Sequence, residues 1–104
     1  MPTYGDYDPH LTKVIQRLAR TEGAVSFSTH AQEEMDDDGF NHLDVLAGLR
    51  RGKAFGPEPR NGDLAANVIH RGHEIRVVVG GLAAAAGDWS RLARIRVVTV
   101  MRQK

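Results

Sequence analysis

The sequence predicts one α+β domain in which N-terminal helices pack on one face of a C-terminal antiparallel β-sheet. Its 104 residues can enclose a single hydrophobic core. Apolar residues recur at helical spacing in the first half and in β-branched runs in the second half. Charge divides in the same way, since residues 1–49 carry a net charge of −6 and residues 50–104 carry +7. We therefore expect a single domain over residues 1–104, with residues 1–7 as a flexible arm.

The composition excludes several classes of protein. The chain has no cysteine, which rules out disulfides, zinc fingers and thiol catalysis and suits a reducing compartment. No apolar stretch approaches the length that crosses a bilayer. The N-terminus lacks the basic segment and apolar run of a secretory signal. We therefore expect a cytoplasmic protein with no membrane partner.

The first helix is predicted to begin after Asp8 and to end before Gly23. An Asp side chain at a helix start accepts a hydrogen bond from a free backbone N–H, and Pro9 suits the first helical position. Glycine is a natural residue at a helix end. The apolar face follows the i, i+3, i+4, i+7, i+8 spacing of one side of a helix. Its members are Leu11, Val14, Ile15, Leu18 and Ala19.

Two further helices are expected before residue 53. Ser28 or Thr29 can cap the second helix, which should break at Gly39 because three aspartates oppose the helix dipole at its C-terminal end. Asn41 can cap the third, which ends in two arginines and Gly52, as the dipole and a glycine cap favour. The three residues 25–27 are too few to assign and are left open as an extended segment.

The second half is predicted to be a sheet. Residues 64–70 and 73–79 form a hairpin around Arg71-Gly72, and residues 93–101 form a closing strand. Two prolines and an Asn-Gly pair between residues 56 and 63 indicate a turn-rich connection. A further short strand near residues 53–55 is left open.

Alternation along these strands predicts a basic outer face. If His70 pairs with His73, the apolar side chains of the hairpin face the helices and Arg76 faces outward. If the closing strand turns its apolar set inward, three more arginines share the face of Arg76, namely Arg94, Arg96 and Arg102. Guanidinium groups bind phosphate oxygens through two hydrogen bonds at once, so this face is a candidate RNA-binding surface. The alternative is a solvated face on which arginine stems cover apolar sheet.

Histidines and a tryptophan are the other candidate functional residues. Metal-free RNA cleavage needs an acid, a base and cations, which His70, His73 and Arg76 can supply. The histidines can instead simply flank an exposed turn, and the predicted register places them away from the arginines. A histidine pair can also bind a transition metal, but no spacing matches a metal motif, so no metal and no cofactor is predicted. Trp89 either stacks on an RNA base or anchors its loop to the core.

The segment Phe27–Met35 (FSTHAQEEM) resembles the opening motif of a family of short bacterial domains of unknown function, Ser-x-His-Ala-x-Glu-Arg-Met. Asp44-Val45, Leu49-x-x-Gly52 and the strands at 74–79 and 95–100 also match the layout of the family. The resemblance spans roughly residues 25–101. The family is similar to the RelE/ParE and BrnT toxins, whose relatives include ribosome-dependent and free mRNA endonucleases held silent by antitoxins.

The resemblance implies a RelE/ParE-like fold and the endoribonuclease of a toxin–antitoxin system. Its partners would be RNA, free or on the ribosome, and a cognate antitoxin, and we leave a homodimer open. His30 is the retained motif residue and is a candidate acid or base. The chain departs from the pattern at Glu34 and Asp38, where the family has arginines. The alternative function is therefore a non-catalytic module, related to such toxins, that binds protein or nucleic acid.

Overall fold

The computed structural model describes residues 5–103, which form an α+β fold with three helices and a five-stranded mixed sheet. The helices are α1 (Pro9–Leu18), α2 (Thr29–Asp38) and α3 (His42–Arg51). The strands are β1 (Val25–Phe27), β2 (Lys53–Arg60), β3 (Asp63–His70), β4 (Ile75–Gly80) and β5 (Ile95–Arg102). Short 3₁₀ turns η1 (Arg71–His73), η2 (Ala83–Ala85) and η3 (Trp89–Arg91) join the later strands. The prediction of N-terminal helices and a C-terminal sheet is confirmed.

The three helices begin at the predicted capping residues. The Asp8 carboxylate accepts the Leu11 N–H at 2.9 Å, and the Ser28 hydroxyl accepts the Ala31 N–H at 3.0 Å. Asn41 caps α3 by a reciprocal pair of hydrogen bonds with Asp44. Gly39 ends α2 with φ of 74°, a left-handed conformation that glycine adopts without strain. None of the helices within residues 5–103 is both long and apolar enough to cross a membrane.

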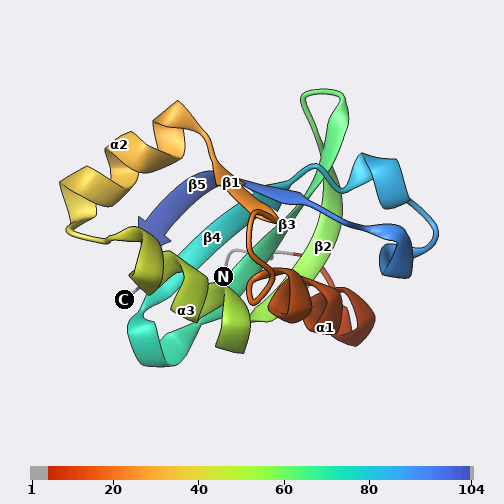
Figure 1. Cartoon of the computed structure of the whole chain (residues 1–104), viewed down its shortest axis with the longest axis horizontal. Helices are drawn as coiled ribbons and strands as arrows, with labels where there is room; N and C mark the ends of the chain where they lie inside the picture. The colour runs from red at the N-terminus through yellow and green to blue at the C-terminus, as the bar shows by residue number, and fades with distance from the viewer. Residues whose placement is uncertain (1–4, 104) are drawn as a thin grey trace.

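The sheet has the strand order β1-β5-β4-β3-β2 and carries α1 and α3 on one face. Figure 1 shows both helices in front of the sheet, with α2 beside β5. The core lies between these layers and is built from aliphatic side chains that exclude water. Its fully buried members include Leu11, Ile15, Val45, Leu49, Ile75, Val77, Val79, Val97 and Val100. The segment left open at residues 25–27 is β1, which runs parallel to β5, so the sheet is mixed rather than purely antiparallel.

The turn-rich connection predicted between residues 56 and 63 is mostly strand, continuous with the short strand considered near residues 53–55. Strand β2 runs from Lys53 to Arg60 and contains both Pro57 and Pro59. Proline lacks a backbone donor, and β2 tolerates it because it is an edge strand whose register shifts between Phe55 and Glu58. The Asn-Gly pair makes the turn into β3, with both residues at positive φ. The sequence did not predict this strand, because prolines favour turns except in edge strands. The sequence alone does not show which strand lies at the edge.

The predicted pairing of the β3–β4 hairpin is wrong by two residues. His70 pairs with Ile75, and Val68 pairs with Val77, because η1 and Glu74 together occupy the turn. Glu74 has φ of 51°, which completes a longer turn than the predicted one. Side chains alternate with a period of two, so a two-residue shift leaves every side chain on its predicted face.

The prediction that Arg102 shares a face with Arg76 is also wrong. A bulge in β5 lets Val78 pair with Thr99 and Val79 with Val97, so Val98 has no partner and the alternation reverses after it. Arg102 therefore lies on the helix side, opposite Ile75. Its guanidinium group donates to the Asp38 carbonyl at 2.8 Å and lies 4.7 Å from the centre of the Phe40 ring. This arginine fastens α2 to the sheet.

Candidate functional site

One of the predicted histidines, His70, lines a basic cavity at the end of the sheet where the β3–β4 turn meets the end of α3. The cavity has a volume of about 550 Å³. Three cationic and two apolar side chains line its walls, together with His70 and one glycine. The residues are Arg51, Lys53, Phe55, Ile69, His70, Arg71 and Gly72. These lining residues include no carboxylate, so the cavity attracts anions.

Close packing at Gly52 brings these residues together. A Cβ atom there would lie 2.6 Å from the Gly48 carbonyl oxygen and 2.9 Å from the Ile69 carbonyl oxygen. Only glycine lets the chain pass directly from α3 into β2 at this distance from β3. As a result, Arg51 and Lys53, on either side of Gly52, lie beside the end of β3, which carries His70.

The rings of His70 and His73 are in direct contact. Their Nδ1 atoms are 2.7 Å apart, and the ring centres are 4.6 Å apart. The backbone N–H of His73 also donates to the His70 Nδ1 at 3.2 Å. The His70 Nδ1 is therefore an acceptor, which assigns its proton to Nε2. The His73 Nδ1 must then be the donor, which leaves the His73 Nε2 with a free lone pair. In this tautomeric arrangement the two rings offer both a proton acceptor and a proton donor.

The surroundings keep His70 neutral. Partial burial lowers the pKa of His70 below its usual value of 6.5, and the neighbouring His73 and Arg51 lower it further. Each cause disfavours a positive charge on the ring. His70 is therefore held in its neutral form at neutral pH, beside the cationic side chains of the cavity.

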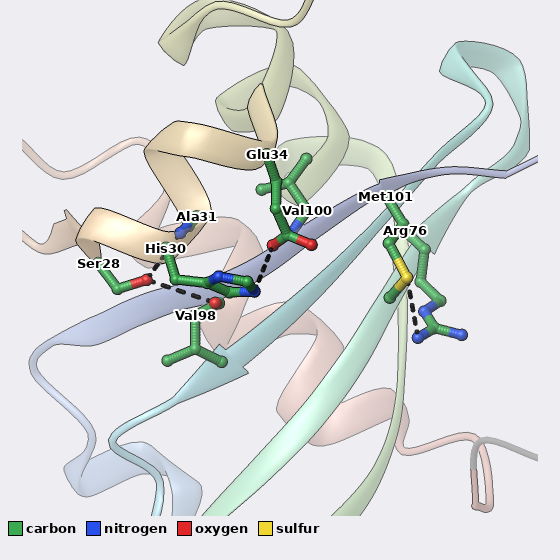
Figure 2. Close-up of polar contacts among 8 residues, drawn as sticks. All are labelled: Ser28, His30, Ala31, Glu34, Arg76, Val98, Val100 and Met101. Atoms are coloured by element: carbon green, nitrogen blue, oxygen red, sulfur yellow. Dashed lines mark hydrogen bonds and ion pairs between the residues drawn. The ribbon is translucent and has the colours of Figure 1, made fainter. Parts of the chain in front are cut away.

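His30 lies at a different place and has a different partner. Its Nε2 atom is 3.3 Å from the Glu34 Oε1, and the same oxygen accepts the Val100 N–H at 3.1 Å (Figure 2). The carboxylate thus closes the edge of β5 beyond the point where β1 ends. Ser28 adds a second bond to this edge, since its hydroxyl donates to the Val98 carbonyl at 3.3 Å. Glu34 therefore binds α2 to the edge of β5, at the position where the resembled family has arginine.

Arg76 lies on the outer face and does not join either histidine group. Its guanidinium group donates to the Met101 Sδ at 3.4 Å, apart from the contacts of His30 in Figure 2. It lines a separate cavity with Glu58, Arg60 and Asn67. The predicted catalytic set is therefore divided over three places, and only His70 and His73 meet.

Arg94 and Arg96 lie at the other end of the sheet. Arg96 pairs with Gly80 at one end of β4, whereas His70 pairs with Ile75 at the other. Five residues of strand separate these positions by about 17 Å. Together with Arg91, the two arginines line a groove that is distinct from the histidine cavity.

Trp89 takes the second of its two predicted roles, as an anchor. Its indole Nε1 donates to the Asp8 Oδ2 at 3.0 Å, and its half-buried ring packs on the hydrophobic core. The cations that do adjoin the histidines were missed as site residues. Arg51 lies at a predicted helix end and Arg71 in a predicted turn. These local patterns account for both residues without a functional site. Only the tertiary contact of α3 with the β3–β4 hairpin shows that they are neighbours.

Neither metal-binding groups of side chains nor similar proteins give a further indication of the function. Within residues 5–103, no group of three or more His, Asp or Glu side chains is placed to hold a metal ion. Comparison of the chain with family models, with curated proteins and with solved structures found no match in any of the three.

Proposed function

We propose that this chain is a toxin-like, RNA-binding domain that cleaves RNA without a metal, at the cavity that His70 lines and with His73 as its neighbour. The observation that supports the proposal is the contact of His70 and His73, with ring nitrogens 2.7 Å apart, where His70 lines a cavity together with three cations. The partners implied are an RNA substrate, free or on the ribosome, and a cognate antitoxin in the cytoplasm.

The chemistry follows from the assigned protons. The His73 Nε2 takes the proton of a ribose 2′-hydroxyl while the 2′-oxygen attacks the adjacent phosphorus. His73 passes its Nδ1 proton to the His70 Nδ1, and the His70 Nε2 gives its proton to the departing 5′-oxygen. The products are a 2′,3′-cyclic phosphate and a 5′-hydroxyl, and the pair stays neutral with its tautomers exchanged. Arg51, Lys53 and Arg71 stabilise the charge that builds on the phosphoryl oxygens.

Cleavage of a labelled RNA oligonucleotide in the presence of EDTA tests this proposal. His73→Gln should lower the rate about 100-fold or more, because it removes the proton acceptor. His10→Gln, at an exposed position in α1, is the matched control and should retain the wild-type rate. Identification of a 2′,3′-cyclic phosphate product checks the step itself. Cleavage that continues unchanged in His73→Gln would rule out this site.

The alternative is a non-catalytic module that binds RNA through the same cavity, and Glu34 and Asp38 at the family's arginine positions favour it. The cavity cations would then provide salt-dependent affinity without cleavage. Each of Arg51→Gln and Lys53→Gln should reduce the slope of log affinity against log salt concentration by about one. Binding with these slopes but no cleavage supports the module, and absence of RNA binding at low salt contradicts both functions.

A further inference from the structure

We propose that the free edge of β1 binds an extended segment of a partner protein, in which apolar and acidic side chains alternate. The segment would add a sixth strand next to β1 and place its side chains alternately into two grooves. The proposal concerns the end of the sheet opposite the histidine cavity and is independent of RNA cleavage.

The backbone of β1 has a free edge. The Ala24 carbonyl accepts the Ile95 N–H, and the Ser28 N–H donates to the Val97 carbonyl, each at 2.9 Å. Backbone groups of successive strand residues point to opposite edges, so Ser26 also faces β5 while Val25 and Phe27 face away from it. Within residues 5–103 the strand order ends at β1. Among these outward groups, and within the described part of the chain, only the Phe27 carbonyl is bonded, accepting from the Gln32 side chain at 3.3 Å. An edge of this kind is a template for another strand.

Two grooves flank this edge, one on each face of the sheet. The groove on the helix side includes Val25, Phe27 and Leu46 and has a volume of about 360 Å³. The groove on the outer side includes Ser26 and Leu92 and also has a volume of about 360 Å³. Because Ser26 alternates with its neighbours, a strand added beside β1 would direct odd and even side chains into different grooves.

The charges of the two grooves determine which side chain enters each. The outer groove is lined by three arginines, Arg91, Arg94 and Arg96, and by no carboxylate. Apolar side chains line both grooves, and the helix-side groove differs in charge because its Arg20 and Arg50 are accompanied by Glu22. Acidic side chains therefore suit the outer groove and apolar ones suit the helix-side groove. A second copy of the chain is disfavoured as the occupant, since pairing β1 with β1 would bring two sets of these arginines together.

Fluorescence anisotropy with a short labelled peptide of alternating valine and glutamate tests the proposal. The peptide should bind, more weakly as salt concentration rises, while a valine–lysine peptide should not. The double variant Arg94→Glu/Arg96→Glu should weaken binding about tenfold or more, since two attractive charges become repulsive. Arg60→Glu reverses an exposed charge at the opposite edge of the sheet and should change affinity less than about twofold.

Two methylated peptides then distinguish strand addition from mere charge attraction. In one peptide the backbone nitrogens of valine are methylated, and in the other those of glutamate. Only one set of N–H groups can face β1, so one peptide should lose binding and the other should keep it. Binding kept by both, or lost by both, contradicts strand addition, as does failure of the unmethylated peptide to bind. Sedimentation that shows a dimer abolished by Arg94→Glu/Arg96→Glu assigns the edge to a second copy and also contradicts the proposal.

Discussion

The two edge strands of the sheet, β2 and β1, differ in how their outward backbone groups are hydrogen-bonded. At the β2 edge, the Asp8 N–H donates to the Ala54 carbonyl and the Gly56 N–H donates to the Asp6 carbonyl, each at 2.9 Å. The Ala54 N–H donates to the buried Thr12 hydroxyl at 2.9 Å. At the β1 edge, the backbone of Val25 points away from the sheet and lies between two grooves.

The difference separates stability from binding. Backbone groups at the β2 edge are bonded within the fold, and the two prolines of β2 lack an N–H that another strand could bond. Substitutions there should reduce the free energy of unfolding. At the β1 edge, within residues 5–103, only the Phe27 carbonyl among the outward groups is bonded, so substitutions that affect only this outward side should change affinity for the proposed partner and leave stability nearly intact.

The largest loss of stability is expected for Gly52→Ala, at the residue that directly precedes the edge strand β2. The new Cβ would lie 2.6 Å from one backbone oxygen and 2.9 Å from another, which forces α3 and β2 apart. We expect the free energy of unfolding to fall by about 3 kcal/mol, measured by urea denaturation. Gly23→Ala is the control, because a Cβ at Gly23 meets nothing within 4 Å and only its φ of 76° is unfavourable. A control that loses more than Gly52→Ala would contradict the steric explanation.

Thr12→Val should have the next largest effect. Valine keeps the shape of the side chain but cannot accept the buried Ala54 N–H. A buried donor without a partner costs about 2 kcal/mol, to be measured by the same denaturation. Thr29→Val, at an exposed position in the first turn of α2, should change stability by less than about 0.5 kcal/mol. Equal effects of the two substitutions would mean that the hydroxyl of Thr12 is not structural.

Glu34→Ala should cost about 1 kcal/mol, because the Val100 N–H loses the carboxylate that covers this part of the β5 edge. Glu34→Gln keeps an oxygen acceptor and should lose less than half as much. Hydrogen exchange at the Val100 amide provides a local measurement, since exchange should accelerate in the alanine variant and much less in the glutamine variant. Unchanged protection in both would show that α2 closes the edge without this side chain.

Asp63, the first residue of β3, should make a smaller, pH-dependent contribution to the free energy of unfolding. Its burial raises the pKa, but the N–H groups of Gly81, Leu64 and Ala83 outweigh burial and hold the pKa below the usual 3.8. A lowered folded-state pKa gives stability that is present above pH 3.8 and is lost as pH falls further through the folded pKa. Acid unfolding of Asp63→Asn should lack this part of the pH dependence. An unchanged acid transition would contradict the assignment.

Val25→Pro should have the smallest effect on stability, less than about 1 kcal/mol, because the N–H it removes faces away from β5. The same substitution should abolish binding of the valine–glutamate peptide. Ser26→Pro is the contrasting variant, since it removes a donor to β5 and should cost about 3 kcal/mol. Similar losses in both variants would show that both sides of β1 are bonded within the fold.

Local patterns predicted most of the elements. Asp8, Ser28 and Asn41 cap the helices as expected because a cap depends on residues within one turn. The faces of the hairpin also came out correctly despite the wrong register, since a shift of two preserves alternation. The faces of β5 after Val98 were predicted wrongly, because valine and threonine residues give no sign of where a bulge falls.

The candidate site was predictable only in its histidines. His70 and His73 flank a predicted turn, so their proximity follows from the chain itself. Their cationic neighbours come from the end of α3 and the start of β2, and nothing local relates those residues to the hairpin. The predicted arginine face failed for a similar reason, since Arg76 and Arg102 lie on opposite sides of the sheet once the bulge is placed.

The amino-acid sequence alone determined the helices, the β3–β4 hairpin and the division of charge between the halves, because caps, turns and periodicity are local properties. The tertiary structure decided which charges gather around the histidines, which carboxylate closes β5 and which strand edge stays open. Those outcomes depend on contacts between residues far apart in the chain, where a glycine that permits close approach or one bulged residue selects the neighbour.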